Sequence, residues 1–135
     1  KFKAQLGDRL QLFDRMSQDK LVQTLANADV LAIPRQSHPA LRVALPTKFA
    51  EYLAIGKPVI VSNVDETADL IHQYDCGLVA EPSIESWSKT LDNAAQLSLR
   101  EKTEMGSRGR DLAESEFAWD RIGDKYAHWL NRWSA

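Results

Sequence analysis

Residues 30–62 read VLAIPRQSHPALRVALPTKFAEYLAIGKPVIVS, in which two short apolar runs flank a basic loop and a helical segment. The runs 30–34 and 58–62 have the length and the continuous apolar character of strands that are buried on both faces of a sheet. Residues 47–55 between them predict a helix that ends at Gly56, a typical C-terminal stop. A strand, a helix and a second strand in this order predict two parallel strands joined by a right-handed crossover.

Segments on both sides of this unit continue the alternation. Residues 10–13 and 77–80 are further short apolar runs that predict strands. A helix over 19–28 would place Leu21, Val22 and Leu25 on one face. Further helices are expected over 65–74, 83–99, 100–116 and 119–133. The sequence therefore predicts an α/β fold: a partial Rossmann-like parallel sheet flanked by helices, with a helical C-terminal segment, in one domain over residues 1–135.

Composition excludes several classes of protein. The chain has 135 residues, of which 44% are hydrophobic and 27% charged, and this suits one globular domain. Seventeen basic and nineteen acidic residues give a net charge of −2, whereas a general nucleic-acid binder would have a strong basic excess. Cys76 is the only cysteine, so we expect no intrachain disulfide, no cysteine metal cluster and a cytoplasmic location. No apolar run in the sequence reaches the length that spans a membrane.

The loop between the two apolar runs is a candidate anion site. No Asp or Glu occurs between Asp29 and Glu51. The interval holds four basic side chains: Arg35, His38, Arg42 and Lys48. Thr47 and Lys48 begin the predicted helix, where free backbone N–H groups and the helix dipole favour a phosphate. In open parallel sheets, ligands bind beyond the carboxyl ends of the strands, which is where this helix would start.

Glu51 lies one turn into the same helix, three residues after Lys48. A carboxylate there can accept hydrogen bonds from the two hydroxyls of a ribose, and Lys48 can donate charge-assisted hydrogen bonds to phosphate oxygens. Together they fit a nucleotide diphosphate. The same spacing is also typical of an exposed ion pair without a function. The spacing alone leaves both interpretations open.

One longer string resembles a known family. Residues 46–62, PTKFAEYLAIGKPVIVS, resemble the donor-site helix and the following strand of family 4 glycosyltransferases, which have the GT-B fold. Shorter pieces are similar as well: residues 25–30 and 33–34 upstream, and residues 69–71, 76–79 and 117–119 downstream. The resemblance therefore covers nearly the whole chain, from about residue 10 to residue 133.

The resemblance implies a role for each matching residue. Glu51 would hold the donor ribose, and the amides of Thr47 and Lys48 would receive the diphosphate. The neighbours of that site would be Arg42, His38 and Arg35. Enzymes of this family transfer a sugar from a nucleotide diphosphate sugar to an acceptor hydroxyl with retention. They need neither a metal nor a cofactor.

The resemblance also implies that the chain is part of a larger enzyme. Lys1 is not an initiating methionine, and the leading strands and the N-terminal acceptor-binding domain of the family have no match in this sequence. We therefore expect residues 1–135 to be a fragment of a nucleotide-sugar donor-binding domain. Alone it should be inactive, and membrane contact would belong only to the intact enzyme.

Val43 departs from the family pattern. It occupies the position of a first glutamate that contacts the donor sugar in many members, and its side chain cannot bind a hydroxyl. The donor sugar, the base, the acceptor and the catalytic residues are therefore left open. Two alternatives share the architecture: a nucleotide-sugar 2-epimerase, and a nucleotide-binding or interaction module without catalysis.

The last predicted helix carries an apolar stripe: Trp119, Ile122, Tyr126, Trp129, Leu130 and Trp133. We expect Trp119 through Tyr126 to cover the sheet of this domain. The resemblance suggests that the far end crosses to the N-terminal domain, so Trp129 and Trp133 should be exposed here. Exposed tryptophans and an unpaired sheet edge favour self-association of the chain.

Two further candidates have structural interpretations. Cys76 precedes Gly77 at the start of a strand, and we expect it to be buried rather than reactive. Arg108 and Arg110 are expected to lie on a solvated helix face.

Overall fold

The computed structural model describes residues 2–39 and 45–133. Within these ranges it contains one parallel sheet of three strands in the order β1-β2-β3. The strands are β1 (Leu31–Ile33), β2 (Val59–Ser62) and β3 (Gly77–Ala80). Three of the four predicted strands are thus confirmed, with bounds that differ from the expected ones by at most one residue at each end.

Helices fill most of the remaining described chain. The N-terminal part holds α1 (Phe2–Leu6), the 3-10 turn η1 (Gly7–Arg9) and α2 (Gln18–Ala26). The strands alternate with α3 (Thr47–Ile55) and α4 (Glu66–Tyr74). After β3 follow α5 (Ile84–Gln96), α6 (Leu99–Leu112), the π-helical turn η3 (Ala113–Phe117) and α7 (Trp119–Trp133). The predicted α/β fold class is confirmed.

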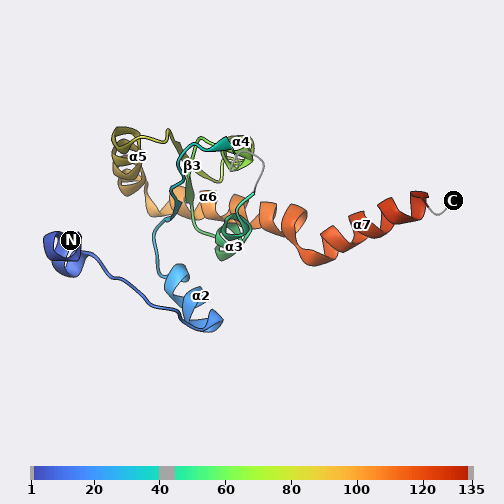
Figure 1. The fold of residues 1–135 in the computed structure, drawn as a ribbon, viewed down its shortest axis with the longest axis horizontal. Helices are drawn as coiled ribbons and strands as arrows, with labels where there is room; N and C mark the ends of the chain where they lie inside the picture. Colours follow the sequence, from blue (N-terminus) through green and yellow to red (C-terminus); the bar gives the residue numbers. More distant parts are fainter. Residues whose placement is uncertain (1, 40–44, 134–135) are drawn as a thin grey trace.

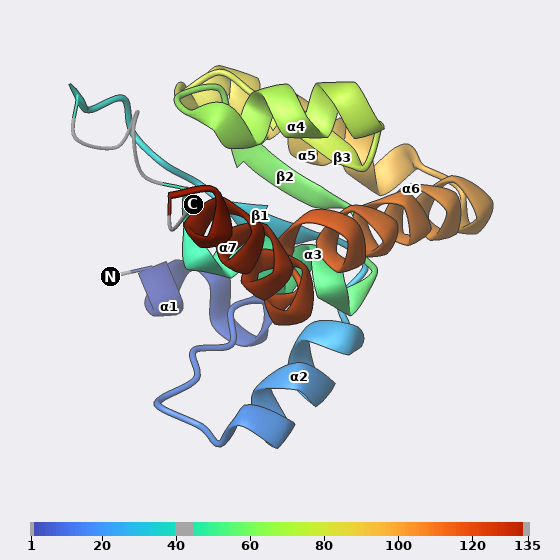
Figure 2. The ribbon, with the colours of Figure 1, turned by 90° about the vertical axis from the view of Figure 1, so that its right-hand side faces the viewer.

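Helices α3 and α4 cover the same face of the sheet. Each connects a strand to the next strand in one direction across the sheet, and right-handed crossovers in one direction put both helices on one side. Figures 1 and 2 show α3 and α4 on this side and α5 on the other. The buried core under these helices includes Ile33, Phe49, Leu53, Val61 and Ile71.

Two glycines allow backbone segments to approach more closely than any side chain would permit. A Cβ on Gly106 of α6 would lie 2.1 Å from the carbonyl oxygen of Gly56, and a Cβ on Gly77 would lie 2.0 Å from the carbonyl oxygen of Val59. Gly56 itself ends α3 in the left-handed conformation, with φ of 77°. The middle of α6 therefore packs closely on the end of α3, and the start of β3 packs closely on the start of β2.

Two arginines of α6 bind the C-terminal ends of neighbouring helices. Arg110 donates from Nε and Nη2 to the carbonyl oxygen of Ala54, at 3.2 and 2.9 Å, near the end of α3. Arg108 donates to the carbonyl oxygen of Asp75 at 2.7 Å and to its carboxylate at 2.8 Å, just after α4. Carbonyls at these positions have no partner within their own helix. The face that was expected only to be solvated thus ties α3 and α4 to α6.

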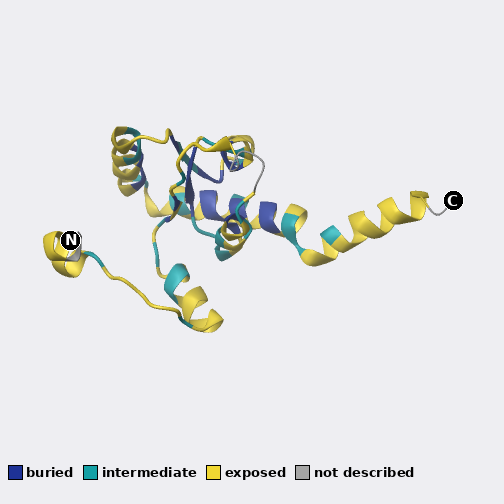
Figure 3. Cartoon of the chain, viewed as in Figure 1, coloured by how far each residue is buried: buried dark blue, intermediate teal, exposed yellow. Residues whose placement is uncertain are grey.

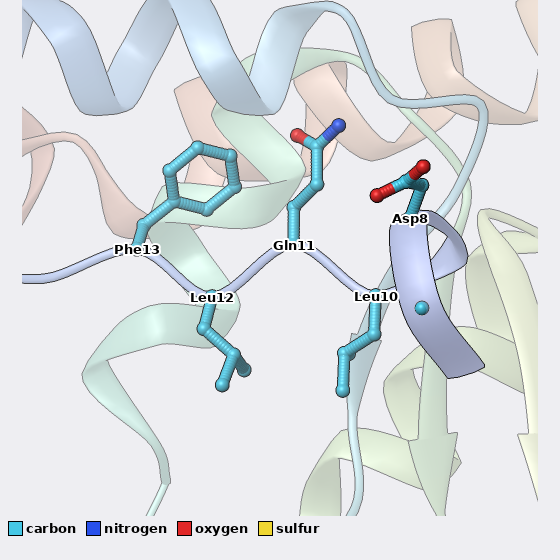
Figure 4. Close-up of a pocket in the computed structure, with 6 residues that line it drawn as sticks. Asp8, Leu10, Gln11, Leu12 and Phe13 are labelled. Carbon is cyan, nitrogen blue, oxygen red and sulfur yellow. The ribbon is translucent and has the colours of Figure 1, made fainter. Parts of the chain in front are cut away.

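The predicted strand over residues 10–13 does not form. Figure 4 shows the alternation that a strand would have, with Leu10 and Leu12 pointing one way and Gln11 and Phe13 the other. Within the described residues no strand pairs with this segment, and Leu12 and Phe13 are 69% and 58% exposed. The prediction was wrong because an extended segment is stable as a strand only when its backbone groups pair with a neighbour.

The expectation that the first half of α7 covers the sheet is also wrong. Trp119 and Tyr126 are 84% and 65% exposed, and Figure 3 shows α7 as an exposed helix that projects from the buried body. The backbone at Ala118 is extended, so the chain turns between η3 and α7 and leads the helix away from the sheet. Trp129 and Trp133 are exposed, as expected.

Candidate functional site

The proposed site residues lie at the edge of the sheet where the parallel strands end. Thr47, Lys48 and Glu51 are on α3, which follows β1, while Arg35 and His38 are in the segment that leaves β1. Arg42, together with Val43, lies outside the described residues. The carboxyl ends of neighbouring parallel strands share one edge, so the N-terminal ends of α3 and α4 both begin there.

The N-terminal end of α3 offers backbone donors to the solvent. Pro46 is the N-cap, in an extended conformation with ψ of 128°, and no side chain of the described residues caps the helix. The N–H of Phe49 donates to the carbonyl oxygen of Pro46 at 2.9 Å. The N–H groups of Thr47 and Lys48 come earlier in the first turn, where a helix supplies no internal acceptor. Both residues are exposed, and no described side chain caps this end of the helix.

Glu51 lines a groove between α2 and α3. The groove has a volume of about 400 Å³. Its lining residues are Gln18, Leu21, Val22 and Leu25 of α2, and Glu51, Ala54 and Ile55 of α3. In the described part of the chain, Glu51 makes no ion pair with Lys48 within 4.0 Å. The carboxylate therefore sits, exposed, at a groove whose other side chains are mostly apolar.

Arg35 is engaged inside the protein. Its guanidinium forms an ion pair with the carboxylate of Asp65, the N-cap of α4, and its backbone N–H donates to the hydroxyl of Ser62 at 2.9 Å. The Arg35 side chain is 15% exposed and that of Asp65 is 1% exposed. His38, by contrast, is exposed. Lys48 is the second residue of α3 and so lies in the first turn, at the uncapped end.

Sequence reasoning missed the residues that hold Arg35. Residue 65 was expected only as the start of a helix, and Ser62 only as the end of a strand. The hydroxyl of Ser62 also accepts a hydrogen bond from Nε1 of Trp87, at 3.2 Å, in α5. A partial signal existed for Asp65, since Asp is a preferred N-cap and its side chain accepts from the N–H of Thr67 at 3.0 Å. Its pairing with an arginine thirty residues earlier has no local signal.

Outside this sheet edge, three further features of the described residues bear on function: a second hollow, the cysteine, and the possible metal or membrane sites. A hollow of about 590 Å³ is lined by residues 7, 8 and 10–13 (Figure 4). Cys76 is fully buried, as expected, and burial raises the pKa of its thiol to about 11. Residues 2–39 and 45–133 contain no cluster of three or more metal-ligating side chains. In the same residues, each helix is too short or too polar to cross a membrane.

Comparison of the sequence with known proteins finds a family match and two relatives. Residues 2–111 match the family described as glycosyl transferases group 1. The chain is also 29% identical, over 129 residues, to a GDP-mannose-dependent alpha-(1-6)-phosphatidylinositol monomannoside mannosyltransferase of Mycobacterium tuberculosis, found in strains CDC 1551 and H37Rv. The match includes 93% of this chain but only 33% of the relative. The chain thus spans about a third of the length of the curated relatives it matches.

Solved structures share the fold. The sucrose-phosphate synthase of Thermosynechococcus elongatus superposes with a TM-score of 0.81 at 20% identity, over 97% of this chain and 32% of that protein. WaaG, a glycosyltransferase involved in lipopolysaccharide biosynthesis, superposes with a TM-score of 0.61 at 23% identity, over 85% of this chain and 31% of that protein. With the family match over most of its length, the chain belongs to the group 1 glycosyl transferases and has the fold class of their GT-B enzymes.

Proposed function

We propose that this chain binds the nucleotide diphosphate sugar of a glycosyltransferase, with α3 as the binding element. The observation that carries the proposal is the arrangement on this one helix. The amides of Thr47 and Lys48 lie at an end that no described side chain caps, and Glu51 follows one turn later at the α2–α3 groove. Donors for an anion are thus followed by an acceptor for a diol, in the order in which diphosphate and ribose are joined.

Each group on α3 has a separate task in this proposal. The helix end and the ammonium of Lys48 bind the diphosphate through backbone N–H groups and charge. Glu51 accepts hydrogen bonds from the ribose hydroxyls. The apolar lining of the groove, with Leu21 and Val22, suits the flat base beyond the ribose. As the sugar leaves, the same donors would stabilise the charge that develops on the diphosphate.

Sugar transfer in this proposal belongs to the whole protein. The residues of an acceptor site would come from the part that the relatives have in addition, and catalysis requires both substrates to be held together. We therefore expect the 135-residue chain to transfer no sugar. In the whole protein we propose retaining transfer that persists in EDTA, on the basis of the family resemblance. A cytoplasmic location is proposed because the only cysteine is a free, buried thiol.

A nucleotide titration tests the proposed site. We expect GDP to bind around millimolar, which corresponds to about −4 kcal/mol, and to shift the amide resonances of Thr47 and Lys48 first. Because the named relatives depend on GDP-mannose, UDP should bind more weakly. Glu51→Ala should weaken binding, whereas Glu85→Ala, on α5, should not. The proposal fails if millimolar nucleotide leaves both amides unshifted, or if Glu51→Ala binds like the wild type.

A further inference from the structure

Asp65 is a buried carboxylate with three partners. It accepts hydrogen bonds from the N–H of Thr67, at 3.0 Å, and from the Thr67 hydroxyl, and it forms the ion pair with Arg35. Its side chain is 1% exposed, and charged or polar partners offset the cost of removing a carboxylate from water in this way. Arg35 is thus a structural counter-ion of Asp65 as well as a residue of the basic loop.

Ser62 connects this pair to the sheet and to α5. The residue is 2% exposed, and its hydroxyl oxygen accepts from the Arg35 N–H at 2.9 Å and from Trp87 Nε1 at 3.2 Å. A hydroxyl oxygen has two lone pairs, so these donors use its full accepting capacity. The exit of β1, the end of β2, the start of α4 and the flank of α5 therefore meet at one buried polar cluster.

We propose that Arg35 and Asp65, which pair directly while Ser62 holds the backbone of Arg35, are positioning residues for the donor site. They fix residues 35–39, the described start of the basic loop, at the sheet edge from which α3 also begins. Holding this segment before a ligand arrives lowers the entropic cost of binding. Arg35 then acts through the backbone that it anchors, and its guanidinium stays with Asp65 when the diphosphate binds. The effect on nucleotide affinity rests on the proposed function, whereas the ordering of the segment does not.

Four single variants separate positioning from other roles. Asp65→Asn keeps an oxygen that caps α4 but removes the charge that Arg35 needs. Arg35→Gln removes the cation, while Arg35→Lys retains it and can still reach a carboxylate. Glu104→Gln is the matched control, because it breaks the exposed pair with Arg100, at 2.7 Å, far from this cluster.

Three measurements on the 135-residue chain are needed. The first is the Kd for GDP from amide shifts. The second is the ¹⁵N relaxation of residues 36–38 without nucleotide. The third is the indole N–H resonance of Trp87, assigned with Trp87→Phe, which reports on the Ser62 hydroxyl. We expect Asp65→Asn and Arg35→Gln to raise the Kd roughly two- to thirtyfold, to loosen residues 36–38 and to move the indole resonance. Arg35→Lys and Glu104→Gln should resemble the wild type.

The outcomes discriminate between the two proposals. Unchanged relaxation and an unchanged Trp87 resonance in both Asp65→Asn and Arg35→Gln would overturn the positioning role. So would a Kd for Arg35→Lys as weak as that of Arg35→Gln, because the guanidinium would then contact the ligand itself. If the wild type binds neither GDP nor UDP, the proposed function fails, and the relaxation and indole measurements still decide whether the cluster orders the segment.

Discussion

Helices α3 and α4 begin at the same edge of the sheet and cover the same face. Their N-terminal ends differ in the capping residue and in the charged residues of the first turn. The end of α4 is capped by Asp65 and carries Glu66 and Asp69 in its first turn. The end of α3 has Pro46 as its N-cap, no acidic residue in its first turn and a lysine at its second position. Each helix end carries about half a positive charge.

The difference shows how one fold distributes this charge. At α4 the protein's own carboxylates neutralise the helix end, and Arg35 in turn balances Asp65. At α3 no described side chain performs that task, so the positive end and Lys48 remain for an external anion. A helix end that the protein's own side chains cap contributes to folding stability. A helix end without such a cap can bind an external anion. The contrast can be tested by removing the acidic cap of α4 and by adding an acidic residue to the first turn of α3.

The largest effect is expected for Asp65→Ala. It removes the cap of α4 and leaves Arg35, which is 15% exposed, without its counter-ion. A lost cap costs about 1 kcal/mol, and a charged hydrogen bond left unmade costs about 1–3 kcal/mol. We expect a loss of about 2–4 kcal/mol in the free energy of unfolding, measured by urea denaturation. A loss no larger than that of Glu104→Ala would mean that α4 does not depend on its internal cap.

The second effect is expected for Thr47→Glu, which gives α3 the acidic first turn that α4 has. The carboxylate should stabilise the helix by about 0.3–1 kcal/mol through the dipole. The same carboxylate would repel a diphosphate, so we expect GDP affinity to fall at least about tenfold, or 1.4 kcal/mol. Stability and affinity should therefore change in opposite directions. If Thr47→Glu binds GDP as tightly as the wild type, the N-terminal end of α3 is not the diphosphate site.

A smaller effect is expected for Lys48→Gln. An exposed charge near a phosphate contributes about 0.2–1 kcal/mol, so GDP affinity should fall by a factor of roughly 1.4 to 5, and less at high salt. Lys57→Gln is the matched control, because Lys57 follows the opposite end of the same helix. Equal losses for the two variants would indicate general charge attraction rather than a site at the N-terminal end of α3.

The smallest effect concerns α7, whose first turn is acidic, as in α4, but whose apolar side is uncovered. Trp129 and Trp133 are 54% and 77% exposed, and their ring centroids lie 5.6 Å apart with the rings tilted by 49°. Exposed apolar patches favour association, so we expect the chain to form weak dimers at high concentration in light scattering. The double variant Trp129→Ser, Trp133→Ser should remain monomeric. A wild-type chain that stays monomeric at the same concentration would contradict this expectation.

Local sequence was sufficient where local chemistry determines the structure. The end of α3 was predicted from Gly56, because a glycine adopts the left-handed conformation at the end of a helix. Strand β3 was predicted because a short apolar run after a helix has few alternatives in an α/β chain. The candidate binding residues on α3 come from the same stretch of sequence and stay a prediction.

Sequence was insufficient where distant backbone geometry decides. Residues 10–13 have the pattern of a strand, but pairing depends on a neighbour that the pattern does not specify. The first half of α7, Trp119 through Tyr126, was assigned to the sheet, although the turn at Ala118 directs the helix elsewhere. The pair of Arg35 and Asp65 depends on how two loops meet after different strands, and no spacing rule connects residues so far apart.

The arginines of α6 have a mechanical consequence. Arg110 holds the end of α3 and Arg108 holds the end of α4, while Gly106 presses α6 against Gly56. The C-terminal ends of α3 and α4 are therefore both bound to α6. Sliding α3 along α4 would require these bonds to break. The N-terminal end of α4 is held as well, by the pair of Asp65 with Arg35, whereas no described side chain caps the N-terminal end of α3. We therefore expect the N-terminal end of α3 to be the least restrained of the four helix ends.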